Sequence, residues 1–400
     1  MKNICSSDKC TGCFACINAC CHNSITMQED KYGELHPVIN EETCINCGAC
    51  SKACPNNNDM LLNRPITCYA SWITDKKKRC ICASGGIGTI LSEYVIKKRN
   101  GVVFGSRYDK HLNPIMSFTD NVEELEKFKG SRYVQSIVGE KTLKDVLAFL
   151  KSGREVIFIG TPCQIAGLKS FLKKDYSNLI TVDLICHGCT PSRYFKEELE
   201  ELCLSKGLTD ISDVRFRGND GYNYYYSLWK DKKCVYSKKG FSSYYLVGFL
   251  SGVTLRDNCF NCSYARPERV SDITIGDFIG LGKNVPFKYP KGNISSVLIN
   301  TKKGKDFYGS VSSTMPDLMN VERQLEERLD YKPSLIEPAK RPLLNPAFRK
   351  LYLEKGYVNA SREVFYDTVR LYDKKYRTEK ILQILFFPYR VLRRFCRLFD

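Results

Sequence analysis

The sequence predicts an α/β protein (α+β overall), in which a small cysteine-rich domain precedes a larger domain built on a mainly parallel sheet. Two observations lead to this prediction. Cysteines gather in C-x-x-C units near the N-terminus, and apolar strand-like runs alternate with helical patterns between residues 101 and 186. With 400 residues, 43% of them hydrophobic, the chain is long enough to bury two or three separate cores.

The composition favours a cytoplasmic protein. The chain has 21 cysteines, yet it begins MKNICSSDKC, without the apolar region of a secretory signal. Clustered C-x-x-C units are typical of metal-bound thiolates in a reducing compartment. The net charge of +17 favours anionic partners, such as acidic cofactors or a lipid surface. No nucleic-acid module is recognisable, so we expect no nucleic-acid partner. No apolar run approaches the roughly 18 residues that span a membrane.

Residues 1–60 contain one cysteine pattern twice, as CTGCFACINAC and CINCGACSKACP. Three cysteines at two-residue spacing bind one [4Fe–4S] cluster, and the fourth, three residues further on, binds the other cluster. We therefore assign the first cluster to Cys10, Cys13, Cys16 and Cys54 and the second to Cys20, Cys44, Cys47 and Cys50. Zinc is the alternative, but it prefers two C-x-x-C pairs for each ion. The segment resembles a bacterial two-cluster ferredoxin, although Cys21 stands where proline is usual.

The next segments are a linker and then a run of βα units. Residues 61–83 are interpreted as a linker with a basic patch, in which Cys80 and Cys82 are free thiols. A Gly-Gly turn before a helix could bind an anion, or it could be only a tight turn. This turn is formed by Ser84, Gly85 and Gly86. Strands are expected at 101–108, 155–160, 178–186 and 272–278, and helices at 122–129, 141–151 and 162–174.

Four later cysteines follow predicted turns or strand ends. Cys163 follows the Gly-Thr-Pro turn after a buried strand, Cys186 ends the next strand, and Cys259 and Cys262 form a C-x-x-C unit. Ligands bind at the carboxyl ends of parallel strands, where the first two lie. We favour a third [4Fe–4S] site made of all four. A nucleophilic Cys163, which would need an activating base, and a buried structural thiol remain as alternatives.

The order of motifs from residue 80 to 340 is similar to that of the coenzyme F420 hydrogenase/dehydrogenase beta-subunit family. The motifs are SGGIGT, GSRYVQS, GTPCQIAGL, CHG, CFNC and RVSDITIGDF. The resemblance implies an FAD-containing α/β region over 84–345, with parts 84–160 and 161–345, and a cluster on the four later cysteines. It also implies flavin contacts in the SGG and GSRY motifs and beside Cys163. These are Ser84, Gly85, Gly86, Gly130, Ser131, Arg132, Tyr133, Thr161 and Gln164.

The last segment, 346–400, is a basic tail. Its end, RTEKILQILFFPYRVLRRFCRLFD, mixes apolar and arginine residues, so it could lie on the inner face of an anionic membrane, dock a partner or pack on its own domain.

The whole pattern predicts an iron–sulfur flavoprotein oxidoreductase with three [4Fe–4S] clusters and FAD. It would exchange electrons with a redox partner protein or a soluble hydride carrier, such as coenzyme F420. The alternatives are a non-catalytic electron-transfer subunit or adapter, and a zinc-structured scaffold. No catalytic residue, hydride carrier or oligomeric state can be assigned.

Overall fold

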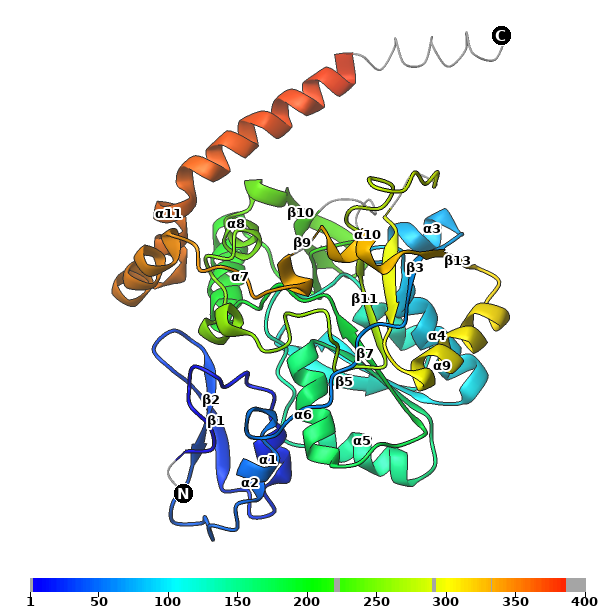
Figure 1. The fold of residues 1–400 in the computed structure, drawn as a ribbon. Helices are drawn as coiled ribbons and strands as arrows, with labels where there is room; N and C mark the ends of the chain where they lie inside the picture. Colours follow the sequence, from blue (N-terminus) through cyan, green and yellow to red (C-terminus); the bar gives the residue numbers. More distant parts are fainter. Residues whose placement is uncertain (1–2, 219–223, 290–292, 332, 386–400) are drawn as a thin grey trace, which may run out of the picture.

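The structure is a computed structural model that describes residues 3–218, 224–289, 293–331 and 333–385 (Figure 1). An eight-stranded sheet lies at its centre, with the strand order β13-β3-β12-β11-β7-β6-β4-β5. The strands are β3 (Thr67–Ile73), β4 (Val102–Tyr108), β5 (Pro114–Thr119), β6 (Val156–Gly160), β7 (Leu179–Leu184), β11 (Ile273–Asp277), β12 (Ser295–Ile299) and β13 (Leu318–Arg323).

The centre of this sheet is parallel. Strands β4, β6, β7 and β11 pair in parallel, which confirms the predicted α/β class. The strands outside them pair antiparallel, so the whole sheet is mixed. Two helices cover each face, because the alternating apolar residues of β4 and β6 face opposite sides. They are α5 (Thr142–Lys151) and α6 (Pro162–Leu172) on one face, and α4 (Ile87–Arg99) and α9 (Lys302–Thr314) on the other.

The expected linker at 61–83 is wrong for its middle part. Residues 67–73 form β3, which lies between β12 and β13 inside the large sheet. Cys68, Ala70 and Trp72 pack in one core cluster, whereas Ile73 faces another. The sequence around β3 resembles a linker because its partner strands lie more than 200 residues further along the chain. A short helix, α3 (Lys76–Cys80), follows it.

The other elements of the α/β region largely match the prediction. The segment expected to be a helix at 122–129 is instead a 3₁₀ helix, η2 (Glu123–Phe128). Two short elements, α10 (Leu325–Leu329) and η5 (Pro333–Leu335), follow β13. Gly86 adopts φ 86° at the start of α4, a left-handed conformation that glycine adopts easily. The Gly-Gly turn therefore has a structural role in starting this helix.

The N-terminal domain packs directly against α6. Its elements are α1 (Ala15–Ala19), β1 (Ile25–Glu29), β2 (Leu35–Ile39), α2 (Ala49–Lys52) and η1 (Pro55–Asn57). Figure 1 shows α1 beside α6, and the two share one core cluster. Asn18 is 2% exposed and joins the domains, because its amide donates to the Gly139 carbonyl at 2.9 Å and accepts from the Leu143 N–H at 3.1 Å.

A further layer covers one end of the large sheet. A three-stranded antiparallel sheet packs with helices around an aromatic core. Its elements are α7 (Ser192–Lys206), β8 (Asp213–Arg215), β9 (Tyr225–Lys230), β10 (Lys233–Lys239), η3 (Gly240–Ser242), α8 (Tyr244–Leu250), η4 (Asp257–Asn261) and α11 (Leu344–Leu385). Helix α11 is kinked at Gly356 and its far end projects from the body (Figure 1).

The predicted tail is therefore helical up to residue 385. The arginine-rich part of that prediction, 386–400, lies outside the described residues. In the part of the chain that the structure covers, no helix combines the length and apolar character needed to cross a membrane. Membrane binding by the tail stays a prediction.

Candidate functional site

A cavity of about 460 Å³ opens at the carboxyl edge of the parallel strands. Its floor is formed where β6, β7 and β11 end, at residues such as Gly160, Leu184 and Asp277. This is the edge at which parallel α/β sheets bind ligands, and the volume suits a cofactor or small substrate. Thr11 and Gly12 of the N-terminal domain also reach the cavity. The large sheet and the N-terminal domain therefore meet at one site.

Eight of the nine predicted flavin contacts line this cavity. They are Ser84, Gly86, Gly130, Ser131, Arg132, Tyr133, Thr161 and Gln164. Gly85 does not line it, because its backbone packs against the sheet: its N–H donates to Ser295 Oγ at 2.9 Å. A Cβ at Gly85 would also lie 2.4 Å from the Ser71 carbonyl oxygen. Gly85 thus holds the turn against the sheet.

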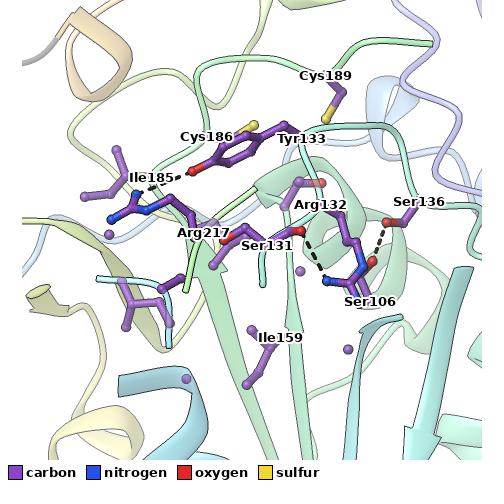
Figure 2. Close-up of a pocket in the computed structure, with 18 of the residues that line it drawn as sticks. Ser106, Ser131, Arg132, Tyr133, Ser136, Ile159, Ile185, Cys186, Cys189 and Arg217 are labelled. Atoms are coloured by element: carbon purple, nitrogen blue, oxygen red, sulfur yellow. Dashed lines mark hydrogen bonds between the residues drawn. The ribbon is translucent and has the colours of Figure 1, made fainter. Parts of the chain in front are cut away.

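The loop at 130–136 is fixed to the start of α6. Gln164 caps this helix by accepting the Thr161 N–H at 2.9 Å, and its amide donates to the Ser136 carbonyl at 3.2 Å. Ser136 in turn contacts Ser106 on β4 at 2.6 Å (Figure 2). Pro162 at the first helical position and the capping box explain why the helix begins here. The same turn places Cys163 at the edge of the cavity.

Burial and mutual charge connect the four later cysteines, which we call the core group: Cys163, Cys186, Cys259 and Cys262. Burial raises the pKa of the Cys163 thiol, and the charges of the other three thiols raise it further. Burial likewise raises the pKa of Cys259 to about 12, with contributions from Cys186 and Cys262. The fold thus brings together residues up to 99 positions apart in the sequence.

A fifth thiol, Cys189, accompanies the core group and was absent from the prediction. It donates a hydrogen bond to Cys186, which lowers the pKa of Cys186 and raises that of Cys189. Cys189 also lines the cavity, as do Cys186 and Tyr133, and all three are drawn in Figure 2. The signal was present as the C-x-x-C unit formed by the motif CHGC.

The first ferredoxin-type set, which we call group I, is Cys10, Cys13, Cys16 and Cys54. Burial raises the pKa of Cys13 to about 11, and the charges of Cys10 and Cys54 raise it further. A fifth thiol again lies beside the set. Cys5 donates hydrogen bonds that lower the pKa of Cys10 to about 4 and that of Cys54 to about 7.

The second set, group II, lines a cavity of its own in the N-terminal domain. All four of its cysteines line a small cavity of about 20 Å³; they are Cys20, Cys44, Cys47 and Cys50. Burial raises the pKa of Cys50, and the charges of Cys20 and Cys44 add to the effect. Cys47 is exposed, and Ile45 beside it is 62% exposed. Group II is therefore the set nearest the solvent.

The core group and group I are neighbours because α6 contacts both of them. A Cβ on Gly167 would lie 2.8 Å from Cβ and 2.9 Å from Sγ of Cys13. Cys163 precedes Gly167 by four residues on the same helix, which is about one turn, or roughly 6 Å of rise. Tyr264, only 5% exposed, lies at the same junction. Burial raises its pKa, and the charges of Cys163 and Cys262 from one group and Cys13 and Cys54 from the other raise it further.

The donor sets suit iron–sulfur clusters by their chemistry. Every one of the twelve cysteines is a free thiol, and each group supplies four sulfur donors. Within the described ranges, no three or more His, Cys, Asp or Glu side chains lie close enough together to bind one single metal ion. A [4Fe–4S] cluster differs from a single ion in that each thiolate binds its own iron atom.

The cavity suits a flavin nucleotide by its mix of walls and charges. Apolar side chains such as Ile87, Met116 and Ile159 can face a ring system. Arg132 and Arg217 lie on opposite sides of the cavity (Figure 2). The Nε atom of Arg132 is buried without a hydrogen-bond partner, whereas its other guanidinium nitrogens donate to the carbonyls of Lys127, Lys129 and Ser131.

Several lining residues were absent from the sequence prediction. Arg217 pairs with Asp277, at 2.9 Å between Nη1 and Oδ2, and donates to the Tyr133 hydroxyl at 3.4 Å. The Tyr133 ring stacks on Phe249 with 4.6 Å between centroids. These contacts join a loop, a strand and a helix that lie far apart in the sequence, and no local motif indicates them.

Comparison with known proteins confirms the two predicted resemblances. Residues 153–315 match the family described as the C terminus of the beta subunit of coenzyme F420 hydrogenase/dehydrogenase. Residues 9–58 match the "4Fe-4S dicluster domain", so the predicted iron–sulfur domain is confirmed. A chain in a solved structure of the F420-reducing [NiFe] hydrogenase complex from Methanosarcina barkeri, derivatised with xenon, is 20% identical. The similarity covers 76% of this chain and 91% of that chain, with a TM-score of 0.45. No curated protein matches.

Proposed function

We propose that this chain, which joins a 4Fe-4S dicluster domain to a domain of the coenzyme F420 hydrogenase/dehydrogenase beta-subunit family, is an iron–sulfur flavoprotein oxidoreductase. It exchanges electrons between a redox partner protein and a two-electron hydride carrier, for which coenzyme F420 is the first candidate. The observation that carries the proposal is the convergence at the cavity. Core-group thiols, the predicted flavin loops and the edge of the N-terminal domain all line it.

Three [4Fe–4S] clusters and FAD, when bound, supply one-electron transfer and its conversion into hydride transfer. The chain's own residues fix their positions. Group II lies nearest the solvent, where a partner protein can approach, and group I lies against α6. Cys163 belongs to the core group and also lines the cavity. The series runs from the surface to the cavity.

The polar residues of the cavity hold and orient the bound group. The start of α6 and the loop at 130–136 are connected through Gln164, so one wall of the cavity is fixed in shape. Arg132 and Arg217 place guanidinium groups on two sides of the cavity, and each is paired with a carboxylate, Asp213 and Asp277 respectively. A guanidinium donates in a planar fork that suits phosphate oxygens. Tyr133, which is half-buried, stacks on Phe249 and accepts a hydrogen bond from Arg217, so it shields that side of the cavity from water.

The first experiment measures flavin, iron and acid-labile sulfide in protein purified without oxygen. The wild type should hold one FAD and about 12 iron atoms, at about four per cluster. Cys163→Ala should fall toward about 8 iron atoms because the core group loses a ligand. Cys203→Ala is the matched control, since Cys203 lies on α7 and packs against a different core cluster. It should retain the wild-type content.

Two outcomes would contradict the proposal. About 8 iron atoms in both the wild type and Cys163→Ala, without flavin, would show that the assignments of the core cluster and of the flavin site are wrong. Full iron content without flavin would favour the alternative, an electron-transfer subunit or adapter whose partner performs the chemistry. If FAD is present, reduction by deazaflavin and nicotinamide carriers then identifies the hydride carrier.

A further inference from the structure

The cavity contains a buried arginine whose charge is not neutralised by any carboxylate in the part of the chain that the structure describes. Arg328, on α10, lines the cavity and is 1% exposed. Its Nε donates to Ser296 Oγ at 3.2 Å, but its Nη1 has no hydrogen-bond partner. Among the described residues, no acidic side chain lies within 4.0 Å of its nitrogen atoms. A buried guanidinium without a counter-charge is costly, so it indicates a missing partner.

The other basic side chains around the cavity differ in this respect. Each has a carboxylate partner: Lys129 with Glu126 at 2.8 Å, Arg132 with Asp213 at 3.7 Å, Arg217 with Asp277 at 2.9 Å and Arg256 with Glu34 at 3.9 Å. The charge of Asp277 also acts on Arg328, but Asp277 already pairs with Arg217. Counted over the described residues, this end of the cavity therefore has two arginines and one carboxylate, which is a net positive charge.

A water molecule would satisfy the hydrogen bond but not the charge. Burial lowers the pKa of Arg328 to about 10, so the guanidinium remains protonated near neutral pH. A protonated guanidinium binds oxyanions through paired N–H donors. Ser295 and Ser84, which also line the cavity, bring hydroxyl groups to the same edge of the sheet. The environment therefore suits an anionic group on a bound molecule.

We propose that Arg328 forms an oxyanion subsite at the β11–β12 end of the cavity, for a phosphate or carboxylate group. Arg328 itself lies outside the matched family segment, which ends at residue 315. The anion belongs either to the cofactor, as the pyrophosphate of FAD, or to the hydride carrier. The first source rests on the proposed function, whereas the subsite itself rests on the buried charge.

Three variants of the holoprotein test the subsite. Arg328→Gln removes the charge, Arg328→Lys keeps the charge but loses the planar fork, and Arg266→Gln is the control at an exposed arginine. Two properties are measured. The first is the fraction of FAD that stays bound on dilution. The second is the rise in melting temperature that inorganic pyrophosphate causes, compared with sodium chloride at the same ionic strength. Iron content reports whether each variant folds.

The subsite predicts that Arg328→Gln weakens FAD retention or pyrophosphate protection by about 10-fold or more, since one charged hydrogen bond is lost. Arg328→Lys should lie between this variant and the wild type, and Arg266→Gln should match the wild type. Loss of FAD retention assigns the anion to the cofactor. Loss of pyrophosphate protection with normal FAD retention assigns it to the carrier.

The proposal is overturned if Arg328→Gln retains FAD and pyrophosphate protection like the wild type. If Arg328→Gln does not fold, Arg328→Lys decides, and wild-type behaviour in that variant overturns the proposal. The proposed function can fail separately. A wild type without FAD contradicts the flavoprotein, but pyrophosphate protection that Arg328→Lys or Arg328→Gln abolishes would still establish the anion subsite.

Discussion

Helix α6 contacts the N-terminal domain at a glycine, and replacing that glycine tests the series of thiol groups. In Gly167→Ala, the new methyl group would lie 2.8 Å from Cβ and 2.9 Å from Sγ of Cys13. Ordinary contacts begin at 3.4 Å, so Cys13 must retreat by about 0.6 Å. A cysteine that binds a cluster cannot move freely. The substitution therefore strains group I or separates the N-terminal domain from α6.

The expected cost follows from packing and helix propensity. Overpacking a closed contact costs about 1–3 kcal/mol, whereas alanine gains about 1 kcal/mol over glycine inside a helix. Gly309→Ala is the matched control, because Gly309 lies in helix α9 and a Cβ there meets nothing within 4 Å. Gly309→Ala should therefore show only the gain in stability from the higher helix propensity of alanine. The two variants should therefore differ in stability by about 1–3 kcal/mol.

The assay follows cluster loss in urea without oxygen, by the visible absorbance of the iron–sulfur clusters. Gly167→Ala should lose its colour at a lower urea concentration than the wild type, and Gly309→Ala at the same or a higher concentration. Iron content before urea shows whether group I is still filled. Equal midpoints and equal iron content for both variants would refute the close contact between Cys13 and α6.

The remaining predictions concern three other residues around the groups. Cys189→Ala should keep about 12 iron atoms, whereas Cys186→Ala should lose about four; the reverse result would exchange their roles as ligand and extra thiol. Tyr264→Leu should lower the stability of the junction by about 1–3 kcal/mol in the same urea assay, and an unchanged midpoint would contradict its position between the groups. Glu34→Gln should destabilise the domain interface by about 3 kcal/mol, because Arg349 and Arg256 lose a buried counter-charge, and urea unfolding compared with Glu268→Gln at an exposed pair measures the loss.

The sequence predicts the parts of this protein that depend on local spacing. The C-x-x-C registers indicated groups I and II, and the alternation of strands and helices predicted the parallel centre of the sheet. Apolar runs do not reveal which distant strands pair, so β3 was interpreted as part of a linker. Cys189 and Arg328 were missed for a related reason. A thiol or an arginine becomes significant only when the fold buries it beside a cavity, and no spacing rule records that placement.

The interface between the N-terminal domain and the rest of the chain contains buried polar and charged contacts. Glu34, 2% exposed at the start of β2, accepts the Asp257 N–H at 3.0 Å and pairs with Arg349 of α11. Asn18 makes a second buried connection to the start of α5. A partner that docked and left would have to hydrate these groups at each encounter, which is costly for buried charges. The interface therefore suits permanent attachment. Because α6 keeps group I and the core group in contact, the proposed redox partner would have to reach only group II, whose Cys47 is exposed.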